Sequence, residues 1–192
     1  LKCNLLFLLI LTSCSEKYSI ETTDELSIVS NQNGATLGYS NNSGVSLIIQ
    51  NGYAFKDLNK NGSLDAYEDW RLDVRSRATD LAQQMSIRDI SGLMLYSSHQ
   101  SIPGRSRGFG AAKYNGKVFP ESGALASDLS DEQKKFLKED NLRHVLITSV
   151  ESPAVAAQWN NNAQAFTEAL SLGIPVNTSS DPRHGSDSYA EY

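Results

Sequence analysis

Cysteine is scarce in this chain, and its two cysteines, Cys3 and Cys14, both lie close to the N-terminus. A disulfide framework is therefore excluded for the remainder, which has to be stabilised by its core and by any bound ion. Lys and Arg form no cluster, and the formal net charge is -5. Nucleic acid is not expected as a partner, because binding to phosphates requires a basic surface.

Several other signals are missing as well. The chain has no glycine-rich phosphate loop and no Cys/His spacing typical of a zinc site. Its apolar run at the N-terminus, Leu5–Leu11, is too short to span a bilayer as a helix. With 192 residues, 40% of them hydrophobic and 20% charged, the composition is that of an ordinary globular domain of moderate size.

The N-terminus has the pattern of an export signal. A basic residue, Lys2, precedes the apolar run, and Thr12-Ser13-Cys14 follows it. Leu11–Cys14 resembles a bacterial lipobox, in which the cysteine receives a lipid. An ordinary secretory signal or a buried apolar segment is the alternative. We expect residues 1–14 to be a lipoprotein signal peptide, Cys14 to be lipidated, and the protein to be an outer-membrane lipoprotein on the periplasmic or cell-surface face.

The segment Asp57–Glu68 matches every position of a twelve-residue calcium loop. Gly62 occupies the sixth position, where the chain must turn sharply, and Glu68 at the twelfth can bind through both oxygens. Calcium is a hard cation that prefers oxygen ligands, and the alternative is a polar Asn-Gly turn without a metal. The predicted calcium ligands are Asp57, Asn59, Asn61, Ser63 through its carbonyl, Asp65 and Glu68.

The surroundings of this loop indicate a structural role for calcium. The preceding segment, Val45–Gln50, resembles a strand and not the helix that leads into the loop of a paired calcium sensor. No second loop of this pattern occurs in the sequence. We therefore expect residues 15–44, rich in Ser, Asn, Thr and Gly, to be a flexible tether and residues 45–71 to be a calcium-loop segment.

Helical patterns dominate the segment after the loop. A helix is expected over Asp69–Met85, and Ser86 with Asp89 predicts a capping box for a second, shorter helix. Residues Ser98–Asp128 are rich in Gly and Ser and are expected to form a long loop. Ser130 should cap a further helix.

The C-terminal third alternates between strand and helix patterns. Arg143–Val150 predicts a buried strand, Pro153 opens a helix that runs to about Leu172, and Ile174–Thr178 predicts the next strand. This order indicates an α/β fold with a parallel sheet. The polar segment Asp181–Gly185 follows the last strand, where such sheets bind ligands. Its side chains could bind sugar hydroxyls, or Asp181 could simply cap the next turn.

A series of motifs is spread from Asp57 almost to the end of the chain. They are Tyr67-Glu68-Asp69-Trp70, Gln84-Met85-Ser86, Gln158-Trp159-Asn160, Gly173-Ile174-Pro175-Val176 and Asp181-Pro182-Arg183-His184-Gly185. With these motifs the sequence resembles the N-terminal barrel domain of glycoside hydrolase family 3, and their order is more specific than any one of them.

The resemblance implies a (β/α)₈ barrel, of which residues 72–192 would be an incomplete N-terminal part following an EF-hand-like calcium loop. It implies a retaining O-glycoside hydrolase of the β-glucosidase or β-xylosidase type, acting on a glycoside or oligosaccharide. Asp181 would bind sugar hydroxyls, and Arg183 and His184 would shape the site. The catalytic nucleophile and acid/base are expected beyond residue 192, so the chain alone should be inactive. The alternative is a non-catalytic calcium-binding surface lipoprotein or carbohydrate-binding module.

Overall fold

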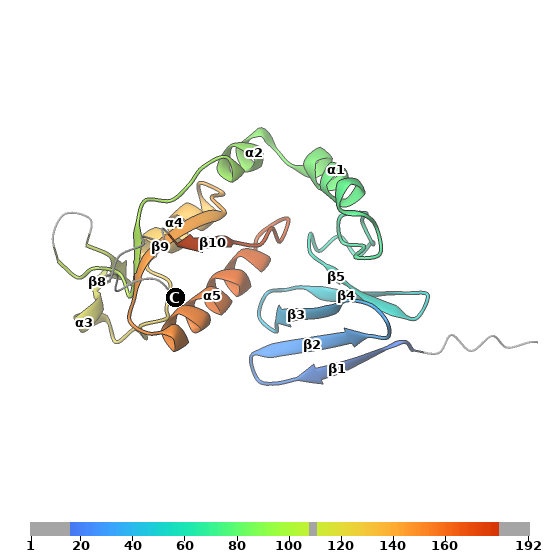
Figure 1. Cartoon of the computed structure of the whole chain (residues 1–192), viewed down its shortest axis with the longest axis horizontal. Helices are drawn as coiled ribbons and strands as arrows, with labels where there is room; N and C mark the ends of the chain where they lie inside the picture. The colour runs from blue at the N-terminus through green and yellow to red at the C-terminus, as the bar shows by residue number, and fades with distance from the viewer. Residues whose placement is uncertain (1–15, 108–110, 181–192) are drawn as a thin grey trace, which may run out of the picture.

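The structure is a computed structural model that describes residues 16–107 and 111–180. A region of antiparallel strands comes first in the chain, and a region of helices around a parallel sheet follows (Figure 1). The helices α1 and α2 connect the two regions across the top of the view in Figure 1. No helix in these described ranges combines the length and the apolar character needed to cross a membrane.

The first region begins with an antiparallel meander where the sequence predicts a tether. It consists of β1 (Tyr18–Thr22), β2 (Leu26–Asn31) and β3 (Thr36–Ser40), paired in that order. The prediction of a flexible tether over residues 15–44 was therefore wrong. The strands were not predicted because this segment is rich in polar residues. The buried positions of β2 include Ser27 and Asn31 beside Val29.

A two-stranded hairpin follows and leads into the candidate calcium loop. Its strands are β4 (Ser46–Gln50) and β5 (Tyr53–Asp57), so the strand-like reading of the first is confirmed. Asn51 and Gly52 form the turn with φ values of 55° and 83°. Positive φ at both central residues matches the right-handed twist of the strands and favours Asn-Gly. The hairpin ends at Asp57, the first residue of the loop.

The next two helices are shorter than the periodicity suggests. Helix α1 (Val74–Gln84) starts five residues later than predicted, because Asp73 is its N-cap and accepts a hydrogen bond from Ser76 N. Helix α2 (Ile87–Leu93) begins with the predicted capping box of Ser86 and Asp89. Each side chain there bonds the other residue's backbone N–H, which satisfies two donors of the first turn.

The second region contains a parallel sheet with strand order β10-β9-β6. Its strands are β6 (Gln100–Ile102), β9 (His144–Val150) and β10 (Asn177–Ser180). The three strands lie in the sheet in the order in which they occur in the chain, as in a β/α barrel. The α/β arrangement with a parallel sheet is confirmed, whereas the described residues contain no closed barrel.

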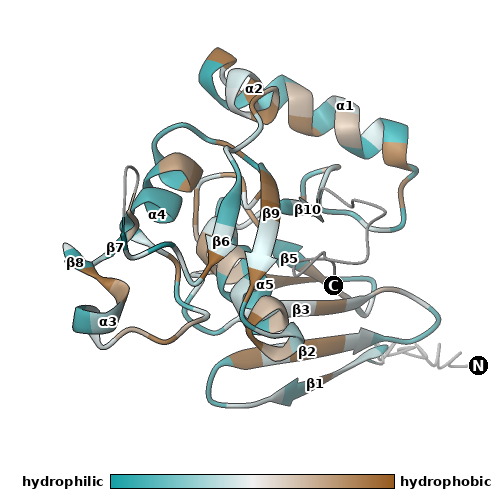
Figure 2. Cartoon of the chain, turned by 60° about the vertical axis from the view of Figure 1, so that its left-hand side comes forward, coloured by the Kyte–Doolittle hydropathy of each residue, from teal (hydrophilic) through white to brown (hydrophobic). Residues whose placement is uncertain are grey.

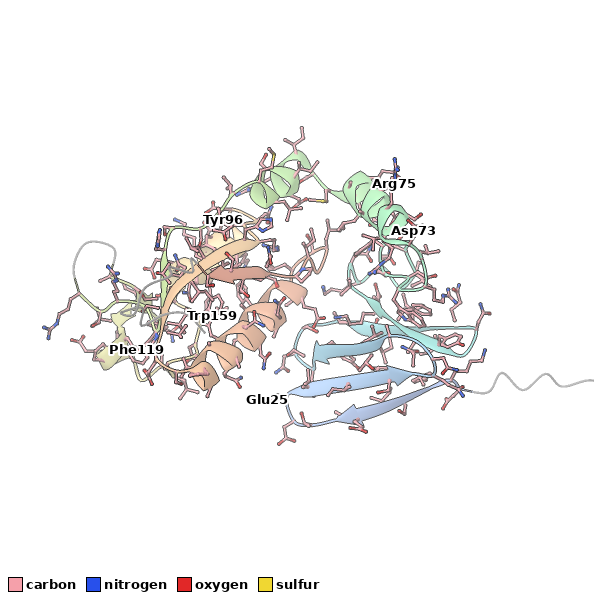
Figure 3. All side chains as sticks on the ribbon, viewed as in Figure 1. Glu25, Asp73, Arg75, Tyr96, Phe119 and Trp159 are labelled. Carbon is pink, nitrogen blue, oxygen red and sulfur yellow. The ribbon has the colours of Figure 1, made fainter. Side chains whose placement is uncertain are left out.

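Helices cover this sheet and complete its core. They are α4 (Asp131–Lys138), capped by Ser130 as predicted, and α5 (Pro153–Glu168). Figure 3 shows Trp159 on α5 close to β9, and Figure 2 shows that β9 is largely apolar. The buried core consists of Ile102, Leu129, Leu137, Leu142, Val145, Trp159, Ala163 and Val176.

Three boundaries in this region differ from the prediction. The predicted loop over Ser98–Asp128 contains β6, a small hairpin of β7 (Lys113–Tyr114) and β8 (Lys117–Val118), and the short helix α3 (Phe119–Ser122). Helix α5 ends at Glu168, four residues earlier than predicted. Strand β10 starts at Asn177, three residues later than predicted. Residues 169–176 connect the two elements, and Gly173 within them has a φ of 58°.

Candidate functional site

The loop Asp57–Glu68 joins β5 to the turn before α1. Its first and last carboxylates are almost fully buried, with 2% of Asp57 and 5% of Glu68 exposed. Gly62 has a φ of 76°, which is the sharp turn expected at the sixth loop position. Lys60 also has a positive φ of 62°.

Asp57 organises the first half of the loop. Its Oδ1 accepts a hydrogen bond of 3.0 Å from Asn61 N, and its Oδ2 accepts one of 2.9 Å from Gly62 N. The hydroxyl of Ser46, across the hairpin, donates to Oδ2 at 3.2 Å. The backbone therefore curls around this carboxylate, which needs these donors because it is buried.

The side chains at loop positions three, five and nine converge. Asn59 Nδ2 and Asn61 Nδ2 each donate a hydrogen bond of 2.7 Å to Asp65 Oδ2. An amide presents oxygen in place of nitrogen after a half-turn about its terminal bond. The same three side chains can therefore surround either a carboxylate oxygen or, with both amides turned, a cation.

Glu68 closes the loop from its other end. Its Oε1 accepts hydrogen bonds from Leu58 N at 2.7 Å and Asn59 N at 3.3 Å, and its Oε2 accepts one from Asp65 N at 3.1 Å. Burial raises the pKa of Glu68, although these backbone N–H groups act in the opposite direction. A nearby cation would also favour the charged form of this carboxylate.

The donor set fits a hard cation only if the asparagines contribute. In residues 16–107 and 111–180, no group of three or more His, Cys, Asp or Glu side chains could hold a metal by itself. The loop offers three carboxylates, two amides and the backbone of Ser63, whose N–H bonds Asn61 Oδ1 at 2.7 Å. Oxygen donors of this kind suit calcium and exclude soft metals.

The loop also contacts the end of α5, a contact that the sequence analysis did not predict. Lys60 Nζ donates to the carbonyl oxygens of Leu58, Glu168 and Leu170 at 2.9, 3.0 and 3.1 Å. Burial lowers the pKa of Lys60, while the carboxylate of Glu168 and the loop carboxylates raise it. Residues 108 positions apart in the chain are thereby joined, and no local pattern predicts such a contact.

The predicted sugar-binding segment lies outside the described residues. Asp181, Arg183 and His184 belong to residues 181–192, and Cys14 belongs to residues 1–15, which the structure does not describe. The described chain reaches Ser180, the last residue of β10. The residues that precede Asp181 therefore run as a strand of the parallel sheet, as predicted.

An aromatic pair at the beginning of β9 was missed by the sequence reasoning. Tyr96 forms an isolated parallel bridge with His144, and their rings stack with centroids 6.2 Å apart. The hydroxyl of Tyr96 also bonds that of Ser179 on β10. Tyr96, which is 53% exposed, thus contacts one residue of β9 and one residue of β10.

The sequence of this α/β chain is similar to part of a known glycosidase. No protein-family model matches the chain. Over 142 residues the chain is 37% identical to a periplasmic β-glucosidase/β-xylosidase of Dickeya chrysanthemi. The matched segment is 73% of this chain and 19% of that protein. The chain thus spans about a fifth of the length of the curated relative that it matches.

Proposed function

We propose that this chain is the N-terminal part of an exported glycoside hydrolase that cleaves β-glucosides or β-xylosides. The observation that carries the proposal is the 37% identity over 142 residues to a periplasmic β-glucosidase/β-xylosidase. The parallel sheet supports it, since β10 ends at Ser180 and α/β enzymes bind ligands at the carboxyl ends of their parallel strands.

The proposed chemistry is hydrolysis with retention of configuration. Two carboxyl groups carry it, one as nucleophile and one as acid and then base, and both come from sequence beyond Tyr192. The part played by this chain is binding. The carboxylate of Asp181 accepts hydrogen bonds from sugar hydroxyls, and Arg183 and His184 shape the same subsite. A charged acceptor fixes the glycosyl unit more firmly than a neutral one.

The test is a hydrolysis assay on the product of the complete gene. The wild type should cleave 4-nitrophenyl β-glucoside or β-xyloside, and Asp181→Ala should lower kcat/KM by about 10²-fold or more, because each charge-assisted hydrogen bond contributes about 1.5–3 kcal/mol. The matched control is Asp24→Ala, at an exposed turn of the meander, which should leave kcat/KM unchanged. Absence of hydrolysis of both substrates, or an unaffected Asp181→Ala enzyme, would overturn the proposal.

The proposal also includes a structural calcium ion in the loop Asp57–Glu68. The convergence of Asn59, Asn61 and Asp65 on one point supports it, together with the buried carboxylates at both ends of the loop. The ion takes no part in catalysis. It would hold the loop between the hairpin and α1.

Export with a lipid anchor at Cys14 is the last component of the proposal. It rests on the basic start, the apolar run Leu5–Leu11 and the small residues before Cys14. The relative's description as periplasmic supports export. Cys14→Ser should abolish incorporation of labelled palmitate and move the protein from the membrane fraction to the soluble fraction. Palmitate incorporation that survives this substitution would exclude Cys14 as the anchor.

A further inference from the structure

The ammonium group of Lys60 occupies an unusual position at the C-terminal end of α5. It lies within hydrogen-bond distance of three carbonyl oxygens, on Leu58 of its own loop and on Glu168 and Leu170 of the helix end. An ammonium has three protons, so all of them are used. The lysine thereby connects the middle of the loop to the helix.

Helix α5 needs such a partner from outside. The last carbonyls of any helix lack intrahelical donors, and they carry the negative end of its dipole. The last turn of α5 contains no basic residue of its own. Lys60 supplies both the donors and the positive charge, and it is delivered by a loop far away in the sequence.

A second lysine fixes the side chain of the same helix residue. Lys56 of β5 forms an ion pair with the carboxylate of Glu168 and also donates to Gly38 O at 3.0 Å. The backbone N–H of Ser40 donates to Glu168 Oε2 at 3.2 Å. Glu168 is only 9% exposed. Its contacts connect the end of α5 to β3 and β5. These contacts connect the helix end to the hairpin that leads into the loop.

The segment after α5 also packs against both ends of the loop. A Cβ atom on Gly173 would lie 3.0 Å from Leu58 Cβ, so the two backbones approach closely. The hydroxyl of Tyr67 donates to Leu172 O at 3.4 Å. Leu58 and Tyr67 line an apolar cavity of about 210 Å³ together with Leu172 and Gly173. The connection from α5 to β10 therefore packs against the loop Asp57–Glu68.

We infer that Lys60 is a positioning residue through which an ion bound in the loop Asp57–Glu68 orders the connection of residues 169–176. The inference rests on the calcium part of the proposed function. An ion fixes the backbone of the loop and with it the Cα of Lys60, and the three hydrogen bonds extend that restraint to the end of α5. The connection leads into β10, so the loop supports the strand that precedes Asp181.

Hydrogen exchange on the product of the complete gene, with calcium and with a chelator, tests this coupling. In the wild type, calcium should slow exchange about tenfold in residues 58–68 and also in residues 169–176. In Lys60→Met, which keeps the length of the side chain and removes the charge, calcium should still protect the loop but no longer the connection. Lys60→Arg should restore protection in part, because a guanidinium still donates.

Two controls separate the possible failures. Lys138→Met removes an exposed lysine near the end of α4 and should behave as the wild type. Glu68→Gln should abolish the effect of calcium on both segments, which tests the coupling even if Lys60→Met does not fold. Protection of residues 169–176 that persists in Lys60→Met or Glu68→Gln overturns the inference. A wild-type loop that calcium does not protect overturns the calcium site itself, while leaving the glycosidase assay unaffected.

Discussion

The indole Nε1 of Trp159 on α5 donates a hydrogen bond of 3.1 Å to Oε1 of Gln133 on α4, and both residues are almost fully buried. The same amide oxygen accepts from Ser130 N at 3.0 Å, which completes the capping box of α4. The amide nitrogen of Gln133 donates to Gln100 Oε1 on β6 at 3.3 Å. One buried side chain thus joins two helices and a strand.

Replacing this glutamine should destabilise the second region. Gln133→Leu leaves the indole N–H of Trp159 buried without an acceptor, which costs about 1–3 kcal/mol. Urea denaturation should show this loss of unfolding free energy. The matched control is Gln83→Leu, at an exposed position of α1, which should change stability by less than about 0.5 kcal/mol. Equal stability of the two variants would contradict the assigned role of Gln133.

Asn31 should be equally important for the first region. Its Nδ2 donates to Ala35 O at 3.0 Å and to Ala54 O at 3.1 Å, and its Oδ1 accepts from Ala54 N at 2.8 Å. Asn31→Ala removes the connection between β2 and the hairpin and should lower the free energy of unfolding by about 1–3 kcal/mol. Thermal unfolding checks this against Asn42→Ala, an exposed position after β3 that should be neutral. If residues 15–44 were a tether, both variants would melt at the wild-type temperature.

The meander shows why sequence patterns failed in this region. On β2, the apolar Leu26 and Ile28 are 41% and 38% exposed, whereas Ser27 and Asn31 face inward and are buried. Pattern reading assumes that apolar positions are the buried ones. The buried polar positions are satisfied by partners distant in the chain, such as Ala54 for Asn31, and a local pattern does not contain that information.

The features that were predicted correctly depend on neighbouring residues. The capping box at Ser86 and the cap at Ser130 use a partner three residues away, and β9 has a continuous apolar centre, Val145–Ile147. The candidate calcium loop, which stays a prediction, was proposed because its spacing is itself a local motif. The contact of Lys60 with the end of α5 was not found, because it depends on how separate elements pack.

Gly92 provides a sharp test of the packing of α2 on the turn before β9. A Cβ atom there would lie 2.4 Å from Asn141 O and 2.5 Å from Asp140 O, which are backbone atoms that cannot turn away. Gly92→Ala should therefore cost about 1–3 kcal/mol of unfolding free energy, despite the better helix propensity of alanine. Gly38→Ala in β3 is the control, because its nearest neighbour would be Leu26 Cδ1 at 4.0 Å. A stabilised Gly92→Ala protein would show that α2 does not pack on this turn.

Calcium should raise the melting temperature of the wild type. An ion that binds only the folded state at one hundred times its Kd adds about 2.7 kcal/mol, which corresponds to roughly 5–10 °C for a chain of this size. Glu68→Gln removes the charge at the twelfth loop position and should lose most of this shift. Glu21→Gln, on the exposed face of β1, should keep all of it. Calorimetric scans with calcium and with a chelator measure the three shifts. Equal shifts in the wild type and Glu68→Gln would place the ion elsewhere. If calcium does not change the melting temperature of the wild type, Asp57–Glu68 is a turn stabilised by its own hydrogen bonds.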